Sequence, residues 1–521
     1  MRTRPNAISS KGIVASSSLQ ASIIGSRILE RGGNVVDAAI ATSAALAVTQ
    51  NNLCGLGGDM FALVRVEGKG ITDVNGSGPS GSRATIDLYE SMGIKDMPQR
   101  GEYSAITVPG LVRGWEAIHS KFGSMEFRDL IMPAIKLAAD GFPVTHNYSA
   151  SIAVSSRLLA KYNWRDLFMP DGGVPEPGEI FRQKDLASTL GEIASDGPSA
   201  FYDGHLQEKI ISGLEKHETL IDTEDFIKHR TTIGNPLSTD FAGTKIYETS
   251  PNSQGATVLL WLNILKEMRE DPERISMDDM VKSGLIAYGE RAKWITDPAF
   301  RAIPPGFLSQ SFARDVLERG SDRPSGNAVS DRGDTTYFTV ADADGNAVSM
   351  IQSNYMGFGS GIVPDGTGFV MQNRGAYFTL NREHHNALAP GKRTFHTLCA
   401  SMGERDGRLA FSLGTMGGDI QPQIHVQMMK SILLDHMDMQ LALDTPRWAV
   451  PYTIYENPSS IIYEHSMDNE KVNALKRIMD TLPVNGLSSQ FGHAQGIMSV
   501  GDGVIMGGAD PRGDGVAIPV L

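Results

Sequence analysis

The chain has 521 residues, of which 41% are hydrophobic and 21% are charged, a composition typical of a folded globular protein and not of a disordered one. Its 47 lysines and arginines against 60 aspartates and glutamates give a net charge of −13. No basic run stands out, so the electrostatic footprint of a nucleic-acid-binding protein is missing. Two cysteines, Cys54 and Cys399, are too few for a disulfide scaffold, and we expect both to be free thiols in the core.

The sequence shows no obvious membrane or export segment. Its longest apolar stretch, residues 38–48, is broken by Thr42 and Ser43 and falls far short of the ~20 apolar residues that a membrane-spanning helix needs. The first ten residues carry positive charge, but the apolar region of a secretory signal does not follow them. We therefore expect a cytoplasmic protein.

The first part of the chain reads mainly as helices. The sequence Gly32-Gly33-Asn34 predicts a turn, with Asn34 placed to cap the buried helix that follows. Gly123 and Gly141 are expected to end two further helices. We predict helices over residues 35–48, 111–122, 127–140 and most of 184–296, and strands at residues 60–66 and 244–248.

The later part reads as strands that follow a polar segment. Residues 311–334 are the most polar stretch and are expected to form an exposed loop. Residues 337–341 and 347–351 then flank an Asp-Gly turn, the pattern of two strands joined as a hairpin. A further strand pair is expected within residues 404–413 and a helix over 420–434. Because helices and strands are mixed throughout, an α/β fold class is predicted.

Several common catalytic motifs are absent. The sequence contains no phosphate-binding G-x-x-x-x-G-K-[ST], no zinc-binding H-E-x-x-H and no nucleophile elbow G-x-S-x-G. Its twelve histidines are scattered, and the adjacent pair His384 and His385 would point to opposite faces of a strand. The sequence therefore predicts no metal site and no cofactor.

One junction between a loop and a strand can carry a nucleophile. The sequence Gly333-Asp-Thr-Thr-Tyr-Phe338 takes the polar segment directly into the predicted hairpin. If the chain is cut before Thr335, the Thr335 hydroxyl can attack an acyl carbon while its own α-amine serves as general base. The reference pKa of an α-amine, near ~8, suits that role at neutral pH. Taken alone, two threonines at the start of a strand also fit ordinary β propensity.

Two features near this junction strengthen the nucleophile interpretation. Ser353 lies at the far end of the partner strand, where its hydroxyl can approach Thr335 across the hairpin. Gly417 and Gly418 follow a strand, and two glycines in a row can offer two backbone N–H groups to one oxyanion because no side chain blocks the approach. Most Gly-Gly pairs are only turns, so it is the combination that supports the interpretation.

Short blocks along nearly the whole chain form a recognisable series. They are residues 33–39, 56–58, 108–110, 121–123, 133–134, 139–142, 334–336, 344–348, 358–361, 416–418, 445–447 and 509–512. In these blocks and in their order the chain resembles the γ-glutamyltranspeptidase family of N-terminal nucleophile hydrolases. So many blocks in the same order are far more specific than any single glycine motif.

The resemblance implies a fold and a maturation step. The fold would be a four-layer αββα sandwich, and the chain would be a proenzyme that cleaves itself between Asp334 and Thr335. The products would be a large subunit, residues 1–334, and a small subunit, residues 335–521. Both would belong to one intertwined domain.

The resemblance also implies roles for four residues. Thr335 would become the nucleophile of the mature enzyme, and Gly417 and Gly418 would be the oxyanion donors. Ser353 stands where the family has a threonine that assists the nucleophile, so the hydroxyl is retained.

Departures from the family pattern fall on the substrate pocket. Asn75 stands where the family has an arginine for the α-carboxylate of a free amino acid, and Tyr377 stands where it has an acidic residue for the ammonium. The paired serines of the family correspond to His396 and Thr397, and Tyr355 takes the place of an asparagine. Both charged contacts for a γ-glutamyl group are therefore missing.

Three blocks, residues 372–378, 393–397 and 414–423, resemble a side branch of the family that includes oxamate amidohydrolase-like and acylase-like members. Arg374 is then the candidate for binding a substrate carboxylate, because a guanidinium pairs with a planar carboxylate through two parallel bonds. The competing interpretation is an exposed structural arginine. His396 either hydrogen-bonds an acyl oxygen or only braces the nucleophile.

We therefore predict a self-processing amidohydrolase that cleaves a small, carboxylate-bearing amide through an acyl-Thr335 intermediate. A genuine γ-glutamyltransferase or glutathione hydrolase is the alternative enzyme. An unprocessed, inactive homologue with a binding or structural role is the alternative of a different class. The expected partners are the substrate and the two fragments of the chain itself, in a monomer or a homo-oligomer, with no nucleic acid and no membrane.

Overall fold

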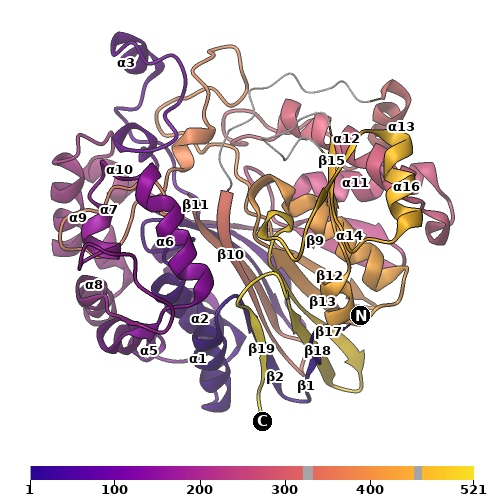
Figure 1. Ribbon diagram of the computed structural model, residues 1–521, viewed down its shortest axis with the longest axis horizontal. Coiled ribbons are helices and arrows are strands. Elements are labelled where there is room, and N and C mark those ends of the chain that lie inside the picture. Colours follow the sequence, from indigo (N-terminus) through magenta and orange to yellow (C-terminus); the bar gives the residue numbers. More distant parts are fainter. Residues whose placement is uncertain (1, 321–332, 451–459) are drawn as a thin grey trace.

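Within the described residues, which are 2–320, 333–450 and 460–521, two seven-stranded antiparallel sheets form the centre of the computed structural model (Figure 1). The first sheet has the order β1 (Ala7–Ser9), β18 (Val504–Ala509), β17 (Ala494–Gly501), β13 (Arg408–Thr415), β12 (Ser401–Arg405), β9 (Thr244–Glu248) and β8 (Leu237–Phe241). The second sheet has the order β19 (Val516–Pro519), β2 (Gly12–Ser16), β10 (Gly333–Asp342), β11 (Ala347–Met356), β3 (Asp59–Val66), β4 (Gly70–Asn75) and β7 (Thr232–Gly234).

Helices cover the outer face of each sheet, on opposite sides of the molecule (Figure 1). The second sheet is covered by α1 (Leu19–Glu30), α2 (Val35–Thr49), α4 (Leu111–Phe122), α5 (Phe127–Asp140), α6 (His146–Leu158), α7 (Trp164–Phe168), α8 (Lys184–Asp196) and α9 (His205–Glu215). The first sheet is covered by α11 (Gly255–Met268), α12 (Met277–Trp294), α13 (Gln310–Arg319), α14 (Gln421–Leu433), α15 (Met439–Asp444) and α16 (Asn469–Ile478). Smaller elements are α3 (Ile86–Ser91), α10 (Thr223–Lys228), β5 (Phe142–Pro143), β6 (Ile180–Phe181), β14 (Trp448–Ala449), β15 (Ile461–Glu464) and β16 (Thr481–Val484).

A third apolar core lies between the two sheets. Phe61, Tyr337 and Ile351 of the second sheet pack there against residues of the first sheet such as Met402 and Ile497. Burial of these faces removes apolar surface from water on both sides of each sheet. The arrangement confirms the predicted four-layer αββα sandwich.

Local sequence signals explain the helices that were predicted correctly. The Asn34 side chain accepts hydrogen bonds from the N–H groups of Val36 and Asp37, and the Asp37 carboxylate accepts one from Asn34 N–H, so α2 begins with a capping box. Every residue of α2 is buried, because the helix lies between the second sheet and α5. The predicted bounds of α4, α5 and β9 coincide with those of the structure.

One expectation was incomplete and another was wrong. Residues 184–296 are mainly helical, as predicted, but β7 and β8 also lie there, and β8 pairs with β9 through a tight turn. The predicted polar loop contains α13, whose first turn is capped by Ser309 and whose Ala313 and Val316 face the core. Phe312 and Leu317 also pack against this core, so the segment does carry apolar residues at helical spacing, and composition alone wrongly favoured a loop. Residues 321–332 of that segment lie outside the described residues.

The helices and the two cysteines can be compared with the predictions from composition. Among the described helices, none combines the length and the apolar character needed to cross a membrane. Cys54 and Cys399 are both buried free thiols, as predicted.

Candidate active site

Thr335 lies at an irregularity in the central hairpin of the second sheet. Asp334 pairs with Tyr355 and Thr336 pairs with Gln352, so Thr335 alone faces two residues of β11. Such a bulge redirects side chains next to it. It brings the Thr335 Oγ1 to 3.1 Å from the Ser353 Oγ, and the Thr335 side chain is buried.

The Ser353 hydroxyl connects the nucleophile candidate to the bond that would be cleaved. It donates a hydrogen bond of 2.7 Å to the carbonyl oxygen of Asp334 and accepts one from the Thr335 hydroxyl. It also accepts a 2.7 Å hydrogen bond from the N–H of Tyr355, whose φ of +79° is uncommon for an aromatic residue. Backbone strain of this kind clusters at functional sites. The geometry polarises the Asp334 carbonyl next to the Thr335 hydroxyl.

The Gly417-Gly418 turn lies across the sandwich from Thr335. Thr339 and Ser412 share a 2.6 Å hydrogen bond between the sheets, and a Cβ on Gly414 would collide with the Tyr337 ring. If this pairing is extended by two residues on each side, Thr335 lies opposite Met416, which follows the end of β13 and directly precedes the glycines. In agreement, the η5 turn (Gly418–Ile420) packs against β10.

Both glycines of this turn adopt conformations that favour glycine. Gly417 has φ +125° and Gly418 has φ +59°. A Cβ on Gly417 would also lie 2.6 Å from Cγ2 of Ile420. The turn can therefore expose backbone N–H groups that a side chain would otherwise cover.

A buried polar network fixes this turn from behind. The Gln254 amide donates hydrogen bonds of 2.9 Å to the carbonyl oxygen of Gly418 and 2.6 Å to that of Thr397. Arg291 donates to the Gln254 amide oxygen at 2.7 Å and forms a 2.7 Å ion pair with Asp419. Because the carbonyl groups are held, the orientation of the adjoining peptide N–H groups is held too. Gln254 and Arg291 belong to no motif in the sequence, and the sequence analysis assigned no role to Asp419, although Asp419 lies in the family block of residues 414–423.

Arg374 is buried on the short η4 helix (Arg374–Tyr377), so the expectation of an exposed structural arginine is wrong. Its guanidinium lies over the Tyr355 ring, 4.4 Å from the ring centroid, and its Nη1 donates a 3.0 Å hydrogen bond to the Thr397 hydroxyl. Its Nε and Nη2 have no hydrogen-bond partner among the described residues. These two N–H groups form the edge that binds a carboxylate in a bidentate manner. Burial lowers the pKa of Arg374 from its usual value.

Asp59 and His396 form a buried pair that the sequence analysis did not anticipate. The Asp59 carboxylate accepts hydrogen bonds from the N–H groups of Gly78 and Gly110, from the Gln372 amide and from His396 Nε2 at 3.1 Å. Burial raises the pKa of Asp59 to about 7, although the charge of Arg374 and the hydrogen bonds from Gln372, Gly78 and Gly110 act to lower it. Its place directly after the glycines of residues 56–58 was the available signal.

The imidazole of His396 is occupied on both nitrogens. Nε2 faces Asp59, and Nδ1 accepts a 3.3 Å hydrogen bond from the N–H of Leu398. Burial, and then the charge of Arg374, keep the pKa of His396 well below its usual value. The neutral ring of His396 therefore holds Asp59 and does not hydrogen-bond Thr335. Asp59 on β3 lies opposite Ser353 on β11 in the strand register.

The side chains of Asn75 and Tyr377 are hydrogen-bonded to other residues of the site. The Asn75 amide oxygen accepts two hydrogen bonds from Ser77, and its nitrogen donates to the Asn252 amide at 2.9 Å. The Tyr377 hydroxyl donates a 2.6 Å hydrogen bond to Asp419, and its ring lies 4.6 Å from that of Tyr355.

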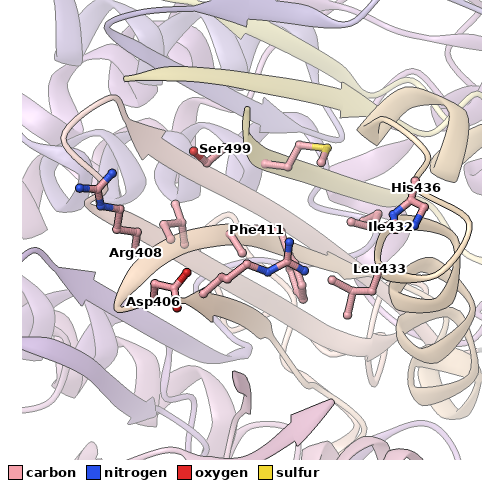
Figure 2. A pocket seen from close by; sticks show the side chains of 11 residues that line it. Asp406, Arg408, Phe411, Ile432, Leu433, His436 and Ser499 are labelled. Carbon is pink, nitrogen blue, oxygen red and sulfur yellow. The ribbon is translucent and has the colours of Figure 1, made fainter. Parts of the chain in front are cut away.

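A surface pocket of about 480 Å³ lies elsewhere (Figure 2). It is at the hairpin end of β12 and β13, opposite to the end that leads to Thr397 and the glycine turn. None of the candidate site residues lines it. Its lining includes Arg408, Phe411, Leu433, His436 and Ser499.

Comparison with known proteins gives concordant matches over the whole chain. Residues 21–520 match the family model described as gamma-glutamyltranspeptidase. The chain is 38% identical to the glutathione hydrolase-like YwrD proenzyme of Bacillus subtilis over 98% of this chain and 99% of the relative. It is 34% identical to the oxamate amidohydrolase proenzyme of Klebsiella pneumoniae over 94% and 95% of the two chains. Among solved structures, the cephalosporin acylase from Bacillus halodurans covers 100% of this chain and is covered over 97% of its own, with 33% identity and a TM-score of 0.91.

Proposed function

The chain belongs to the γ-glutamyltranspeptidase family of N-terminal nucleophile hydrolases, and we propose that it matures by cleaving its own Asp334–Thr335 bond and then hydrolyses an amide through an acyl-Thr335 intermediate. The observation that carries this proposal is the Ser353 hydroxyl, which lies 3.1 Å from the Thr335 hydroxyl and 2.7 Å from the Asp334 carbonyl oxygen. Nucleophile, polarising donor and scissile carbonyl are therefore together in the intact chain.

In the maturation step, the Thr335 Oγ1 attacks the carbonyl carbon of Asp334 while the Ser353 hydroxyl donates to the developing oxyanion. The bond from that carbon to the Thr335 nitrogen breaks, the nitrogen takes up the hydroxyl proton, and an ester remains. Water hydrolyses the ester, which leaves a carboxylate on Asp334 and a free hydroxyl and amine on Thr335. The fragments would be residues 1–334 and 335–521.

In turnover, the freed α-amine of Thr335 takes the proton of its own hydroxyl as that oxygen attacks the substrate carbonyl. The N–H groups of Gly417 and Gly418 stabilise the oxyanion. The amine then protonates the leaving group, and a water molecule releases the acyl group from Thr335. Ser353, freed from Asp334 by the cleavage, keeps its hydrogen bond to the nucleophile.

The substrate that fits the site best is a small amide with one carboxylate and no amino group. The free Nε and Nη2 edge of Arg374 would bind the carboxylate, with the rings of Tyr355 and Tyr377 beside it. The nearby carboxylates are already engaged, because Asp419 pairs with Arg291 and Asp59 accepts four hydrogen bonds. A substrate ammonium would therefore lack a dedicated partner.

A glutathione hydrolase or γ-glutamyltransferase is the second candidate, and the relative named glutathione hydrolase-like favours it. The two candidates differ in whether the enzyme prefers substrates with an α-amino acid group. Such a substrate would lack charged partners at Asn75 and Tyr377, and each missing charge-assisted contact costs about 1.5–3 kcal/mol of binding free energy. For two contacts we expect a preference of roughly 10²–10⁴ in kcat/KM for the amino-free acids.

The test is a kinetic comparison of a γ-glutamyl anilide, glutathione, a glutaryl amide and oxamate on the processed enzyme. We expect the glutaryl amide or oxamate to have the higher kcat/KM. A wide margin in favour of the γ-glutamyl compounds would refute the proposed substrate class and establish the second candidate.

The same assay tests Arg374. Arg374→Ala is expected to raise KM for the carboxylate-bearing substrate about 10–100-fold, because one charge-assisted pair is lost, while maturation stays intact. Arg374→Lys keeps the charge without the bidentate edge and should restore only part of the loss. An acyl anilide without a carboxylate serves as the control substrate, and an equal loss on that substrate would show that Arg374 acts only through the fold.

The network behind the glycine turn makes a further prediction. Gln254→Ala removes two hydrogen bonds that hold the turn, and we expect kcat to fall about tenfold with little change in KM. Gln427→Ala is the matched control, since Gln427 also donates to two carbonyl groups, those of Gln423 and Trp448, but away from the turn. Equal kcat values for the two variants would contradict the positioning role.

A further inference from the structure

Three potential metal ligands converge behind the glycine turn. Glu248 ends β9, Cys399 precedes β12, and His425 lies on α14, directly after the turn. One ligand atom from each residue lies within 4.8 Å of the other two, and all three residues are fully buried. The ligands are far apart in the sequence, which explains why the search for motifs did not find them.

The protein atoms alone leave this cluster unsatisfied. His425 Nδ1 donates a 2.8 Å hydrogen bond to one oxygen of Glu248, but neither the second Glu248 oxygen nor His425 Nε2 has a partner among the described residues. The Gln421 amide oxygen accepts a 3.1 Å hydrogen bond from the Cys399 N–H and lies 3.5 Å from the Cys399 sulfur, whereas the amide nitrogen has no partner among the described residues. A buried carboxylate with so few donors is costly unless a cation balances it.

We propose that Glu248, Cys399 and His425 bind one divalent transition-metal ion of the zinc class, with the amide oxygen of Gln421 as a fourth donor. Imidazole, thiolate and carboxylate together favour zinc over the harder magnesium and calcium ions. The site is closed and lacks access for a substrate, which is typical of structural and not of catalytic zinc.

Charge and protons balance in such a site. On binding, the Cys399 thiol and the Glu248 carboxyl bind as thiolate and carboxylate and release any protons they carry to solvent, so two negative ligands neutralise the divalent ion. The imidazole of His425 stays neutral and binds the ion through the nitrogen that carries no proton, so it releases no proton. Only small shifts are needed, because the ligand atoms already lie close together.

The ion would join the segments that carry the proposed active site. Cys399 follows Thr397 by two residues, Glu248 lies before the loop that holds Gln254, and His425 follows the Gly417-Gly418 turn. We therefore assign it a structural role. Its presence is independent of the proposed reaction, so failure of the two proposals can be distinguished.

The test begins with metal content. Protein purified without an affinity tag and without chelators is expected to contain about one equivalent of zinc or a related metal by mass spectrometry. Growth with cobalt should then give a thiolate-to-cobalt charge-transfer band. In Cys54→Ser the only thiol is Cys399, so the band in this variant identifies the sulfur ligand.

Variants provide the second measurement. Cys399→Ser and His425→Gln should lose the metal and melt at lower temperature, whereas Cys54→Ser should keep both the metal and the melting temperature. Wild-type protein without stoichiometric metal, even after growth with added zinc and cobalt, would overturn the proposal. Metal without the charge-transfer band in Cys54→Ser would overturn it as well, because the ion would then lie elsewhere. Neither result requires the ligand variants to fold.

Discussion

Thr335→Ala is expected to leave one unbroken chain of 56.2 kDa on a denaturing gel and to abolish amide hydrolysis. The variant lacks the oxygen that lies beside the Asp334 carbonyl, and Ser353, which remains, donates to that carbonyl and is not positioned to attack it. Thr335→Ser retains the attacking atom and should still mature. Fragment masses that correspond to residues 1–334 and 335–521 in the wild type would locate the cut.

The neighbouring threonine provides the matched control. Thr336 is buried on the same strand, and Thr336→Val replaces its hydroxyl with a methyl group at nearly constant volume. We expect normal cleavage in this variant. Cleavage of Thr335→Ala between the same two residues would mean that an external protease makes the cut. An intact wild-type chain would instead favour the inactive homologue with a binding role.

Gly418→Val and Gly417→Val are expected to reduce kcat about 10²–10³-fold, the typical cost of losing one oxyanion donor. A branched side chain covers the backbone N–H groups and disfavours the positive φ angles of this turn. Maturation should continue, because Ser353 supplies the donor for that step. The measurement is single-turnover and steady-state kinetics on protein that has been checked for processing.

Backbone strain alone must be separated from loss of the donor. Gly503 also has a positive φ, +71°, and lies on the turn between β17 and β18 with open space around it. Gly503→Val therefore reports the cost of strain far from the site. A similar kcat in the Gly503 and Gly418 variants would remove the glycine turn from the mechanism.

The spacing of residues on either side of the Asp-Gly turn was sufficient to predict that Thr335 lies beside Ser353, because the turn and the alternating apolar residues define the register of the hairpin. It could not foresee the bulge, which depends on how β11 bends at Tyr355. The positions of Gly417 and Gly418 relative to Thr335 depend on the packing of two sheets, and the family resemblance supplied what local patterns could not.

Asp59, Gln254 and the Glu248–His425 pair were not predicted, and the reason is physical. Buried polar groups must find partners, but these partners come from segments hundreds of residues apart or from other sheets. A single glutamine or aspartate in a sequence does not reveal whether it will be exposed or will hold a turn. Arg374 was identified because a family block contains it, and only the structure shows which of its N–H groups remain free.

Strands from both sides of the proposed cut alternate within each sheet. Cleavage would therefore change folding from a reaction of one chain into a reaction of two fragments. In the second sheet, the cut lies near the start of β10, and the rest of β10 and all of β11 lie between β2 and β3, which precede the cut. In the first sheet, β12, β13, β17 and β18 follow the cut and lie between β1 and β9, which precede it. The intact chain folds as one molecule, whereas a cut and unfolded chain would have to find its other half. The thermal midpoint of the mature protein should therefore rise with protein concentration, and that of Thr335→Ala should not. After cleavage, fragments that unfold and separate would refold only slowly, because each must meet its partner. The fold must therefore be complete before the bond is broken.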